Sequence, residues 1–262
     1  VKFNMAGIQK FAGKIAIITG ASSGIGAATA VLFSKHGATL ALTGRNVANL
    51  NSVAEKCCTS ETPLTIQADL NKEADTIKIV EETVKKYGRI DILVNNAGII
   101  EMGNIENTSL EQYDRVMNTN VRSMYHLTML ATPYLIETKG TIVNISSVNG
   151  IRAFPGVLAY NISKAAVDQL TRTVALELAP KQVRVNSVNP GVTITELQKR
   201  GGLNEEAYKA FLERSCTTHA LGRPGEADEV AQAISFLASS DSSFITGASI
   251  PVDGGRHAMC PR

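Results

Sequence analysis

The sequence has no long hydrophobic run, and this absence sets aside several classes of protein. Its 262 residues are 44% hydrophobic, which is enough for a sizeable core. No stretch approaches the roughly 18 uninterrupted apolar residues that a membrane span requires. Residues 1–13 mix Lys2 and Lys10 with polar side chains and lack the apolar core of a signal peptide. We therefore expect no membrane span and a cytoplasmic protein.

An excess of charge and a metal-binding cysteine pattern are also missing. The 26 basic and 24 acidic side chains are interspersed and give a net charge of +2, whereas nucleic-acid binding requires basic residues concentrated on one face. Cys57, Cys58, Cys216 and Cys260 form no C-x-x-C pair and have no metal-ligand spacing. We expect free thiols in a reducing compartment, no metal site and no nucleic-acid partner.

Short β-branched runs alternate with helix-length segments, and no linker, repeat or low-complexity stretch divides them. Most of the runs are apolar throughout, which is typical of strands covered on both faces. The expected strands are residues 15–19, 39–43, 64–67, 92–95, 141–145, 184–189 and 248–252. The expected helices are residues 25–36, 73–87, 110–136, 158–178 and 227–237, with Pro180 ending the fourth.

This alternation predicts one α/β domain over residues 1–262. Strands and helices in this order form right-handed crossovers, and hence a parallel sheet with helices on both faces. The expected fold is a doubly wound, seven-stranded parallel sheet in three layers, the Rossmann fold. In such sheets the ligand crevice lies at the carboxyl ends of the strands, near the point where the strand order reverses.

A glycine-rich loop directly follows the first expected strand. Residues 19–26 read Thr-Gly-Ala-Ser-Ser-Gly-Ile-Gly and open into a helix. Glycines allow a tight turn and close approach to a pyrophosphate, while the helix N-terminus supplies unpaired N–H donors. Glycines also serve ordinary turns, but here a strand and a helix flank them in the required order. The expected cofactor contacts are Gly20, Ser22, Ser23, Gly24, Ile25 and Gly26.

The end of the second strand favours NADPH over NADH. An NAD site usually places a carboxylate about 20 residues beyond the glycines, whereas this chain has Gly44 and Arg45 there. A guanidinium can bind a 2′-phosphate in bidentate fashion, although a solvated surface arginine is the alternative. NADPH/NADP+ is therefore the expected cofactor, with NADH possible. After the third strand, Asp69 and Leu70 could contact the adenine, although Asp69 could equally cap a helix.

Three motifs together resemble the short-chain dehydrogenase/reductase superfamily. They are residues 19–26, the Asn-Asn-Ala-Gly run at 95–98, and Tyr-Asn-Ile-Ser-Lys at 160–164. Further matches are Asn120, Ser147, residues 190–191 and residues 251–255, so the resemblance covers residues 13–255. It is closest to single-domain NADP-preferring members, among them bacterial ketoacyl-carrier reductases and animal oxidoreductases.

Tyr160 and Lys164 are the centre of the expected chemistry. Four residues apart, they project from one face of the expected helix, and of six tyrosines only Tyr160 has a lysine at this spacing. A free tyrosine has a pKa of about 10, which is high for proton transfer near neutrality. A neighbouring ammonium favours the phenolate. We therefore expect Lys164 to lower the pKa of Tyr160.

The resemblance assigns catalytic roles to four residues. It makes Tyr160 the general acid in reduction and Lys164 its partner, which also binds the nicotinamide ribose. Ser147 would position the substrate oxygen, and Asn120 would retain a water that links Lys164 to solvent. Ser147 is chosen over Ser146 because it lies 13 residues before Tyr160, the family's separation. Asn120 is chosen over Asn118 because an apolar residue follows it. Taken singly, a serine could cap a strand end, Asn120 could bend a helix and Lys164 could be solvated.

Further residues are expected around the nicotinamide and the substrate. Asn149 joins Ser147 and Tyr160 as a substrate-binding residue. Residues 193–218, here called the lid, have no strand pattern, and in the family this region covers the substrate, with residues 201–202 as a hinge. Apolar residues that could enclose the substrate are Val148, Ile151, Phe154, Val157, Leu197, Leu203, Tyr208 and Phe211. The last four, in the lid, could equally pack it onto the core. The remaining expected cofactor contacts are Asn96, Ala97, Gly98, Pro190, Gly191 and Thr195.

The function expected from these features is NADPH-dependent reduction of a ketone or aldehyde, with a lipophilic, ketosteroid-like or other lipid substrate. One alternative is an NAD-linked alcohol or hydroxysteroid dehydrogenase working oxidatively, and another is a non-catalytic nucleotide-binding scaffold. An acyl-carrier ketoreductase would need a basic docking patch, and Lys199, Arg200 and Arg214 lie beside three glutamates. The family usually forms tetramers, here through residues 110–136 and 158–178, and residues 256–262 could reach a neighbouring subunit.

Overall fold

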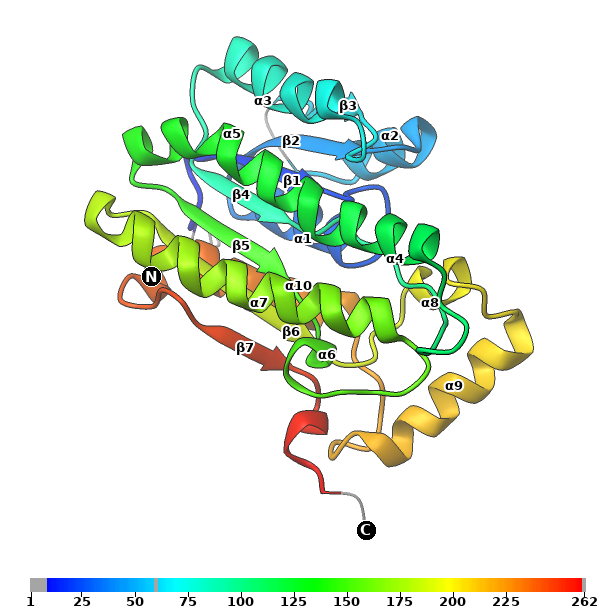
Figure 1. Ribbon diagram of the computed structural model, residues 1–262. Coiled ribbons are helices and arrows are strands. Elements are labelled where there is room, and N and C mark those ends of the chain that lie inside the picture. The colour runs from blue at the N-terminus through cyan, green and yellow to red at the C-terminus, as the bar shows by residue number, and fades with distance from the viewer. Residues whose placement is uncertain (1–8, 59–60, 261–262) are drawn as a thin grey trace, which may run out of the picture.

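Seven parallel strands form one sheet in the order β3-β2-β1-β4-β5-β6-β7 (Figure 1). The computed structural model describes residues 9–58 and 61–260. The predicted doubly wound sheet is confirmed, and each strand lies within one residue of its predicted bounds. The strands are β1 Ile15–Thr19, β2 Thr39–Gly44, β3 Leu64–Gln67, β4 Ile92–Asn95, β5 Thr141–Ile145, β6 Arg184–Pro190 and β7 Ser249–Val252.

Helices cover both faces of the sheet. On one face α1, α2 and α10 pack through Phe33, Leu50 and Ile234, and on the other α3, α5 and α7 pack through residues such as Ile79 and Leu127. The helices are α1 Gly24–Lys35, α2 Val47–Glu55, α3 Glu73–Tyr87, α4 Leu110–Met117, α5 Ser123–Thr138, α6 Val148–Ile151, α7 Leu158–Leu178, α8 Leu197–Arg200, α9 Glu205–Thr218 and α10 Ala227–Ala238.

The strand order reverses at β1, which pairs with β2 on one side and β4 on the other. Every residue of β1, β4 and β5 is buried, as expected for central parallel strands covered on both faces. The loops after β1 and β4 therefore leave the sheet side by side and open the crevice between them. The expected ligand crevice lies at this point.

The predicted helix over residues 110–136 is wrong as a single helix. One turn of π-helix, Asn118–Arg122, separates α4 from α5. The buried Asn120 side chain bonds to the backbone of Ile99 on a neighbouring segment, and a π-turn accommodates this inserted contact. The bend is thus set by a tertiary contact that helix periodicity does not reveal.

Four helices, α2, α6, α8 and α9, were missing from the prediction, and the two longer ones, α2 and α9, carry a recognisable cap. The Asn46 side chain accepts a hydrogen bond from the N–H of Asn49 at the start of α2, at 2.9 Å. Asn204 does the same for the N–H of Ala207 at the start of α9, at 2.8 Å. Asparagine before a helix is a standard N-cap, so this signal was present in the sequence.

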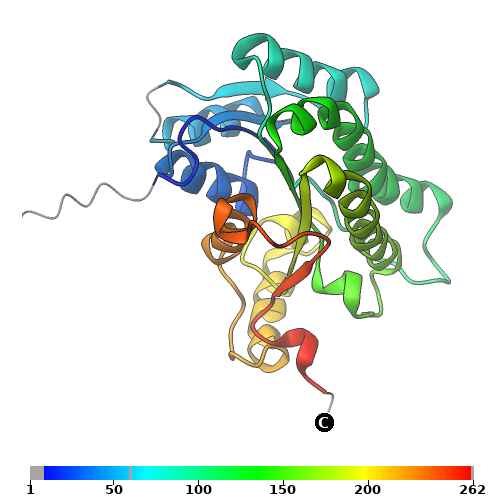
Figure 2. The same cartoon turned by 90° about the vertical axis from the view of Figure 1, so that its left-hand side faces the viewer.

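Both views place α9 and the segment after β7 on the same side of the molecule, beyond the carboxyl ends of the strands (Figures 1 and 2). Within the described ranges, no helix is long and apolar enough to cross a membrane. All four cysteines carry free thiols. The expectations for the first eight residues and for the last two of the tail concern positions outside the described residues.

Candidate active site

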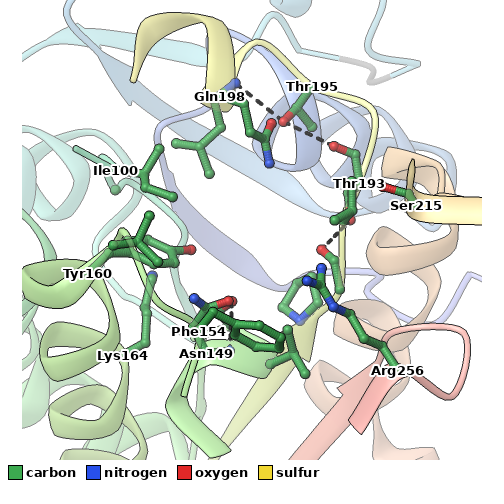
Figure 3. Close-up of a pocket in the computed structure, with 18 of the residues that line it drawn as sticks. Ile100, Asn149, Phe154, Tyr160, Lys164, Thr193, Thr195, Gln198, Ser215 and Arg256 are labelled. Carbon is green, nitrogen blue, oxygen red and sulfur yellow. Dashed lines mark hydrogen bonds between the residues drawn. The ribbon is translucent and has the colours of Figure 1, made fainter. Parts of the chain in front are cut away.

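A pocket of about 1340 Å³ opens at the carboxyl ends of the central strands (Figure 3). Its walls come from the loops that follow β1, β4, β5 and β6, and from the lid. It brings together thirteen of the residues predicted to act in catalysis or to bind the cofactor or the substrate. They are Ser23, Gly24, Ile25, Asn96, Ala97, Gly98, Ser147, Asn149, Tyr160, Lys164, Pro190, Gly191 and Thr195.

The glycine loop after β1 has no room for larger residues. Gly20 and Gly24 have φ angles of +63° and +54°, a region that L side chains rarely adopt. A Cβ added at Gly26 would lie 2.4 Å from the carbonyl oxygen of Gly20. The loop is therefore a backbone cradle at a helix N-terminus, which suits the phosphates of a dinucleotide.

Asn96 supports this loop from the neighbouring strand. Its Nδ2 donates to the carbonyl oxygens of Thr19 and Gly20, at 2.9 and 3.2 Å. The Thr19 hydroxyl in turn accepts from the N–H groups of Asn96 and Ala97, at 2.9 and 3.0 Å. Asn96 thus lies in the pocket wall with its amide directed at the loop. Thr19 was not singled out in the sequence, although it stands at the end of β1.

Asn120 is buried behind the pocket in the π-turn. Its Oδ1 accepts from the Ile99 N–H at 2.8 Å, and its Nδ2 donates to Ile99 O at 2.9 Å and to Ser163 Oγ at 3.0 Å. A Cβ added at Gly98 would lie 3.2 Å from Oδ1 of Asn120 and 3.6 Å from Nζ of Lys164. Asn118 is exposed, so the geometry favours Asn120 over it.

Tyr160 and Lys164 lie in the wall of the pocket on α7, and both are buried (Figure 3). Nζ of Lys164 donates to the carbonyl oxygen of Ile145 at 2.8 Å and lies 5.6 Å from the centre of the Tyr160 ring. Lys164 is therefore not a solvated surface lysine. The hydrogen bond to the end of β5 directs its ammonium toward the crevice.

The expected lowering of the Tyr160 pKa is not present in the protein alone. Burial raises the pKa of Tyr160 to about 12, and a hydrogen bond with the Ser147 hydroxyl acts in the opposite direction. Burial also lowers the pKa of Lys164 to about 8, while the nearby Asp168 carboxylate opposes this shift. The prediction from sequence considered neighbouring positive charge, whereas the loss of water around Tyr160 and Lys164 determines the direction of both pKa shifts.

Ser147 rather than Ser146 faces the reactive side chains. The Ser147 hydroxyl donates to Asn149 Oδ1 at 3.2 Å and accepts from the N–H of Asn149 at 3.1 Å, so it caps α6. The Ser146 hydroxyl instead donates to the carbonyl oxygen of Lys164 at 3.1 Å. Asn149 is fixed in turn by Asn161, whose Oδ1 accepts from Asn149 Nδ2 at 2.6 Å.

A buried carboxylate supports the site and was missed in the sequence. Asn189 Nδ2 donates to both oxygens of Asp168, at 3.1 and 3.0 Å, and to the carbonyl oxygen of Ser147 at 2.9 Å. Burial raises the pKa of Asp168, and hydrogen bonds from its neighbours oppose the shift. Asp168 follows Lys164 by four residues on α7, and this spacing was the available signal.

Several predicted cofactor residues lie outside the walls of this pocket. Arg45 is exposed at the end of β2, and no hydrogen bond or ion pair holds its guanidinium among the described residues. Asp69 does not cap α3, whose N-cap is Lys72. Its Oδ1 accepts from the N–H of Asn71 at 3.1 Å. The remaining residues of this group are Gly20, Ser22 and Gly26, which follow β1, and Leu70, which follows β3.

The lid consists of α8 and α9 with their connections. Leu197 and Phe211 face the pocket, whereas the Tyr208 hydroxyl donates to the carbonyl oxygen of Thr195 at 3.0 Å and ties α9 to the start of the lid. Arg200 Nη2 donates to Ser23 Oγ in the glycine loop at 3.1 Å. Ile151 was expected to line the pocket, but it is 42% exposed and lies outside the lining residues.

The fold and the crevice define a doubly wound α/β protein with a dinucleotide-type glycine loop. The family model described as enoyl-(acyl carrier protein) reductase matches residues 20–257. The chain is 42% identical to 3-oxoacyl-[acyl-carrier-protein] reductase of Thermotoga maritima, over 94% of this chain and 99% of that protein. It is 41% identical to glucose 1-dehydrogenase of Gluconobacter oxydans, over 94% of this chain and 93% of that protein.

Solved structures agree with this assignment. A short-chain dehydrogenase/reductase of unknown function from Caenorhabditis elegans, solved with cofactor, matches with a TM-score of 0.89 and 35% identity over 96% of this chain and 97% of that one. The 3-ketoacyl-(acyl-carrier-protein) reductase of Brucella melitensis, complexed with NADH, matches with a TM-score of 0.85 and 35% identity. The match covers 94% of this chain and 99% of that one. The chain belongs to the short-chain dehydrogenase/reductase superfamily and is an oxidoreductase acting on alcohol or carbonyl groups.

Proposed function

We propose that this protein reduces a ketone or aldehyde with NADPH, and that Tyr160 donates the proton. The observation that carries the proposal is the burial of Tyr160 and Lys164, with Ser147 beside them, in a pocket continuous with the glycine loop. Proton donor and dinucleotide cradle thus face one cavity. A scaffold that only bound nucleotide would not need this buried pair.

The reduction would divide its work among a few side chains. Bound NADPH supplies the hydride. Ser147 hydrogen-bonds the carbonyl oxygen of the substrate and holds it near the Tyr160 hydroxyl, which releases its proton as negative charge develops on that oxygen. Lys164 then stabilises the phenolate that remains. Asn120 holds the π-turn behind Lys164, where a retained water would connect the amine to solvent.

Burial of Tyr160 disfavours the oxidative direction. An ordinary tyrosine is already protonated at neutral pH, and a pKa raised to about 12 leaves still less phenolate. An oxidative enzyme needs the phenolate as a base, which burial disfavours. Relatives named glucose 1-dehydrogenase and meso-2,3-butanediol dehydrogenase keep an oxidative, NAD-linked activity as the second candidate.

The preference for NADPH would depend on Arg45, whose exposed guanidinium has no protein partner among the described residues and is available for a 2′-phosphate. Replacing Arg45 with Ala should lower kcat/KM for NADPH by about tenfold, because a charge-assisted bidentate contact is lost. The value for NADH should change less than about twofold. Equal losses with both cofactors would contradict this role for Arg45.

The substrate would have an apolar body. Apolar side chains from several segments line the pocket, namely Ile100, Met102, Val148, Phe154, Val157, Leu197 and Phe211. A panel of cyclic, aliphatic and steroid-like ketones, followed by loss of NADPH absorbance, tests this directly. Turnover should rise with apolar size, and turnover of none of the ketones would refute the proposed activity.

An acyl-carrier substrate is favoured by the relative from T. maritima and opposed by the lid. Lys199 lies 2.8 Å from Glu205 and 3.8 Å from Glu196, so its charge is already compensated. Of the other two basic candidates, Arg200 is directed at the glycine loop. Of these three basic residues only Arg214 has no side-chain partner among the described residues, so a carrier protein that carries phosphates and carboxylates would find little unpaired positive charge on the lid.

We also propose a cytoplasmic homotetramer, with the free thiols of the cysteines supporting a reducing compartment. Exposed apolar side chains lie on the helices expected at the interfaces, among them Tyr125, Met129, Ile162 and Leu176. Contiguous exposed apolar surface marks association sites. Sedimentation analysis should give four times the chain mass, and a monomer would contradict the proposed assembly.

A further inference from the structure

The pocket carries an unpartnered arginine at the end remote from the glycine loop. Arg256 lies in a short turn, Arg256–Ala258, which begins after a three-residue connection from β7, and it lines the pocket across from Tyr160 (Figure 3). Its Nε atom is buried and has no hydrogen-bond partner. Within the described residues no ion pair holds its guanidinium, which lies over the Phe154 ring at 4.4 Å from the ring centre.

The neighbours of Arg256 do not neutralise it. Asp253 is close enough to attract it, but its oxygens accept from the N–H groups of Gly255 and His257 and contact the His257 ring. Arg214 of the lid also lines the pocket, and its positive charge acts against that of Arg256. Burial, opposed by Asp253 and reinforced by Arg214, lowers the pKa of Arg256. Two guanidinium groups therefore line the cavity, and among the described residues no ion pair holds either of them.

This end is too far from the glycine loop to serve the cofactor phosphates. Four inter-strand spacings of about 4.8 Å separate β1 from β7, or roughly 19 Å. At the glycine loop, Arg200 already contacts Ser23. Arg256 instead packs on Phe154, in the segment between Ser147 and Tyr160 that borders the reacting carbonyl. An anion bound at Arg256 would therefore belong to the substrate.

We propose that Arg256 binds a carboxylate carried by the substrate, with Arg214 adding a second positive charge. The proposal rests on the proposed carbonyl reduction, since it names the far end of the same substrate. The two Nη groups of a guanidinium match the two oxygens of a carboxylate. The apolar wall between Tyr160 and Arg256 then encloses the chain that joins carbonyl and carboxylate. The substrate class is an amphipathic keto acid rather than a neutral lipid ketone.

Binding of a simple probe pair tests the proposal without turnover. Octanoate and octanamide have the same size and differ in charge, and their Kd values can be measured by calorimetry on enzyme saturated with NADP+. Wild-type protein should bind octanoate at least tenfold more tightly. Arg256→Met should remove that preference, and Arg256→Lys should retain part of it. Arg172→Met removes an exposed arginine that bonds Gln169 on α7 and should leave the preference unchanged.

Two results would overturn the assignment. One is equal or undetectable binding of the two probes to wild-type protein, and the other is a preference that survives in Arg256→Met. The NADP+ affinity and Tm of each variant show whether it is folded, and Arg256→Lys keeps the test open if the Met variant is unstable. Failure of the proposed reduction would instead appear as no turnover of any ketone or keto acid, whatever the octanoate result.

Discussion

The two ends of the pocket are built in different ways. At the glycine-loop end, Gly20, Gly24 and Gly26 leave the backbone itself as the binding surface, and Asn96 fixes that backbone. At the other end the surface is made of side chains from separate segments, such as Phe154 and Arg256. The first end suits a ligand that every member of the superfamily shares. The second can vary from one member to another without disturbing the fold.

Lys164 lies between the two ends of the pocket. Replacing it with Met should have a larger effect than the Gly26 substitution and the pH change described next. The change removes the positive charge beside Tyr160 and the hydrogen bond to Ile145. We expect kcat/KM for carbonyl reduction to fall by about 10³-fold, within the range for loss of general acid catalysis. Steady-state kinetics measure it, and a loss below tenfold would mean that Lys164 does not assist the proton donor.

Gly26→Ala should damage the glycine-loop end selectively. The new Cβ would lie 2.4 Å from Gly20 O and 2.5 Å from Asn96 Nδ2, so the loop must shift. We expect the Kd for NADPH to rise by about 100-fold in a fluorescence titration. Gly88→Ala is the matched control, because Gly88 ends α3 with a φ of +75° and a Cβ there meets nothing within 4 Å. It should lower Tm and leave the NADPH affinity unchanged.

The pH dependence of reduction should follow the loss of the proton from Lys164, which lies between the two ends of the pocket. With a pKa of about 8, Lys164 is charged below pH 8 and loses its proton above it. Tyr160, with a pKa of about 12, stays protonated throughout this window. We expect kcat/KM to be level from pH 6 to 8 and then to fall by up to tenfold per pH unit. A profile that stays level to pH 10, or rises above pH 8, would contradict this assignment.

The sequence predicted the glycine-loop end well because its constraints are local. The glycines, the strand before them and the helix after them are consecutive, so the spacing alone indicates the turn. The same holds for Tyr160 and Lys164 on one helix face. The choices of Ser147 and Asn120 over their neighbours agree with the geometry, although the catalytic roles themselves stay predictions.

The features of the site that the sequence did not predict depend on contacts between segments that are distant along the chain. The π-turn at Asn120 arises from its bonds to Ile99, and the pKa of Tyr160 is set by burial that no spacing conveys. Asp168 reaches the site through Asn189, 21 residues further along the chain. Arg256 was read as part of a tail, because only the folded chain places it against Phe154.

The central claim is that Tyr160 supplies the proton in a pocket whose other parts bind the cofactor. Tyr160→Phe tests it most directly, because it removes one oxygen and keeps the ring. We predict that this variant binds NADPH with a Kd within about twofold of wild type, while the single-turnover rate of NADPH oxidation by a ketone falls by at least about 10³-fold. A variant that binds NADPH and oxidises it at the wild-type rate would contradict the account.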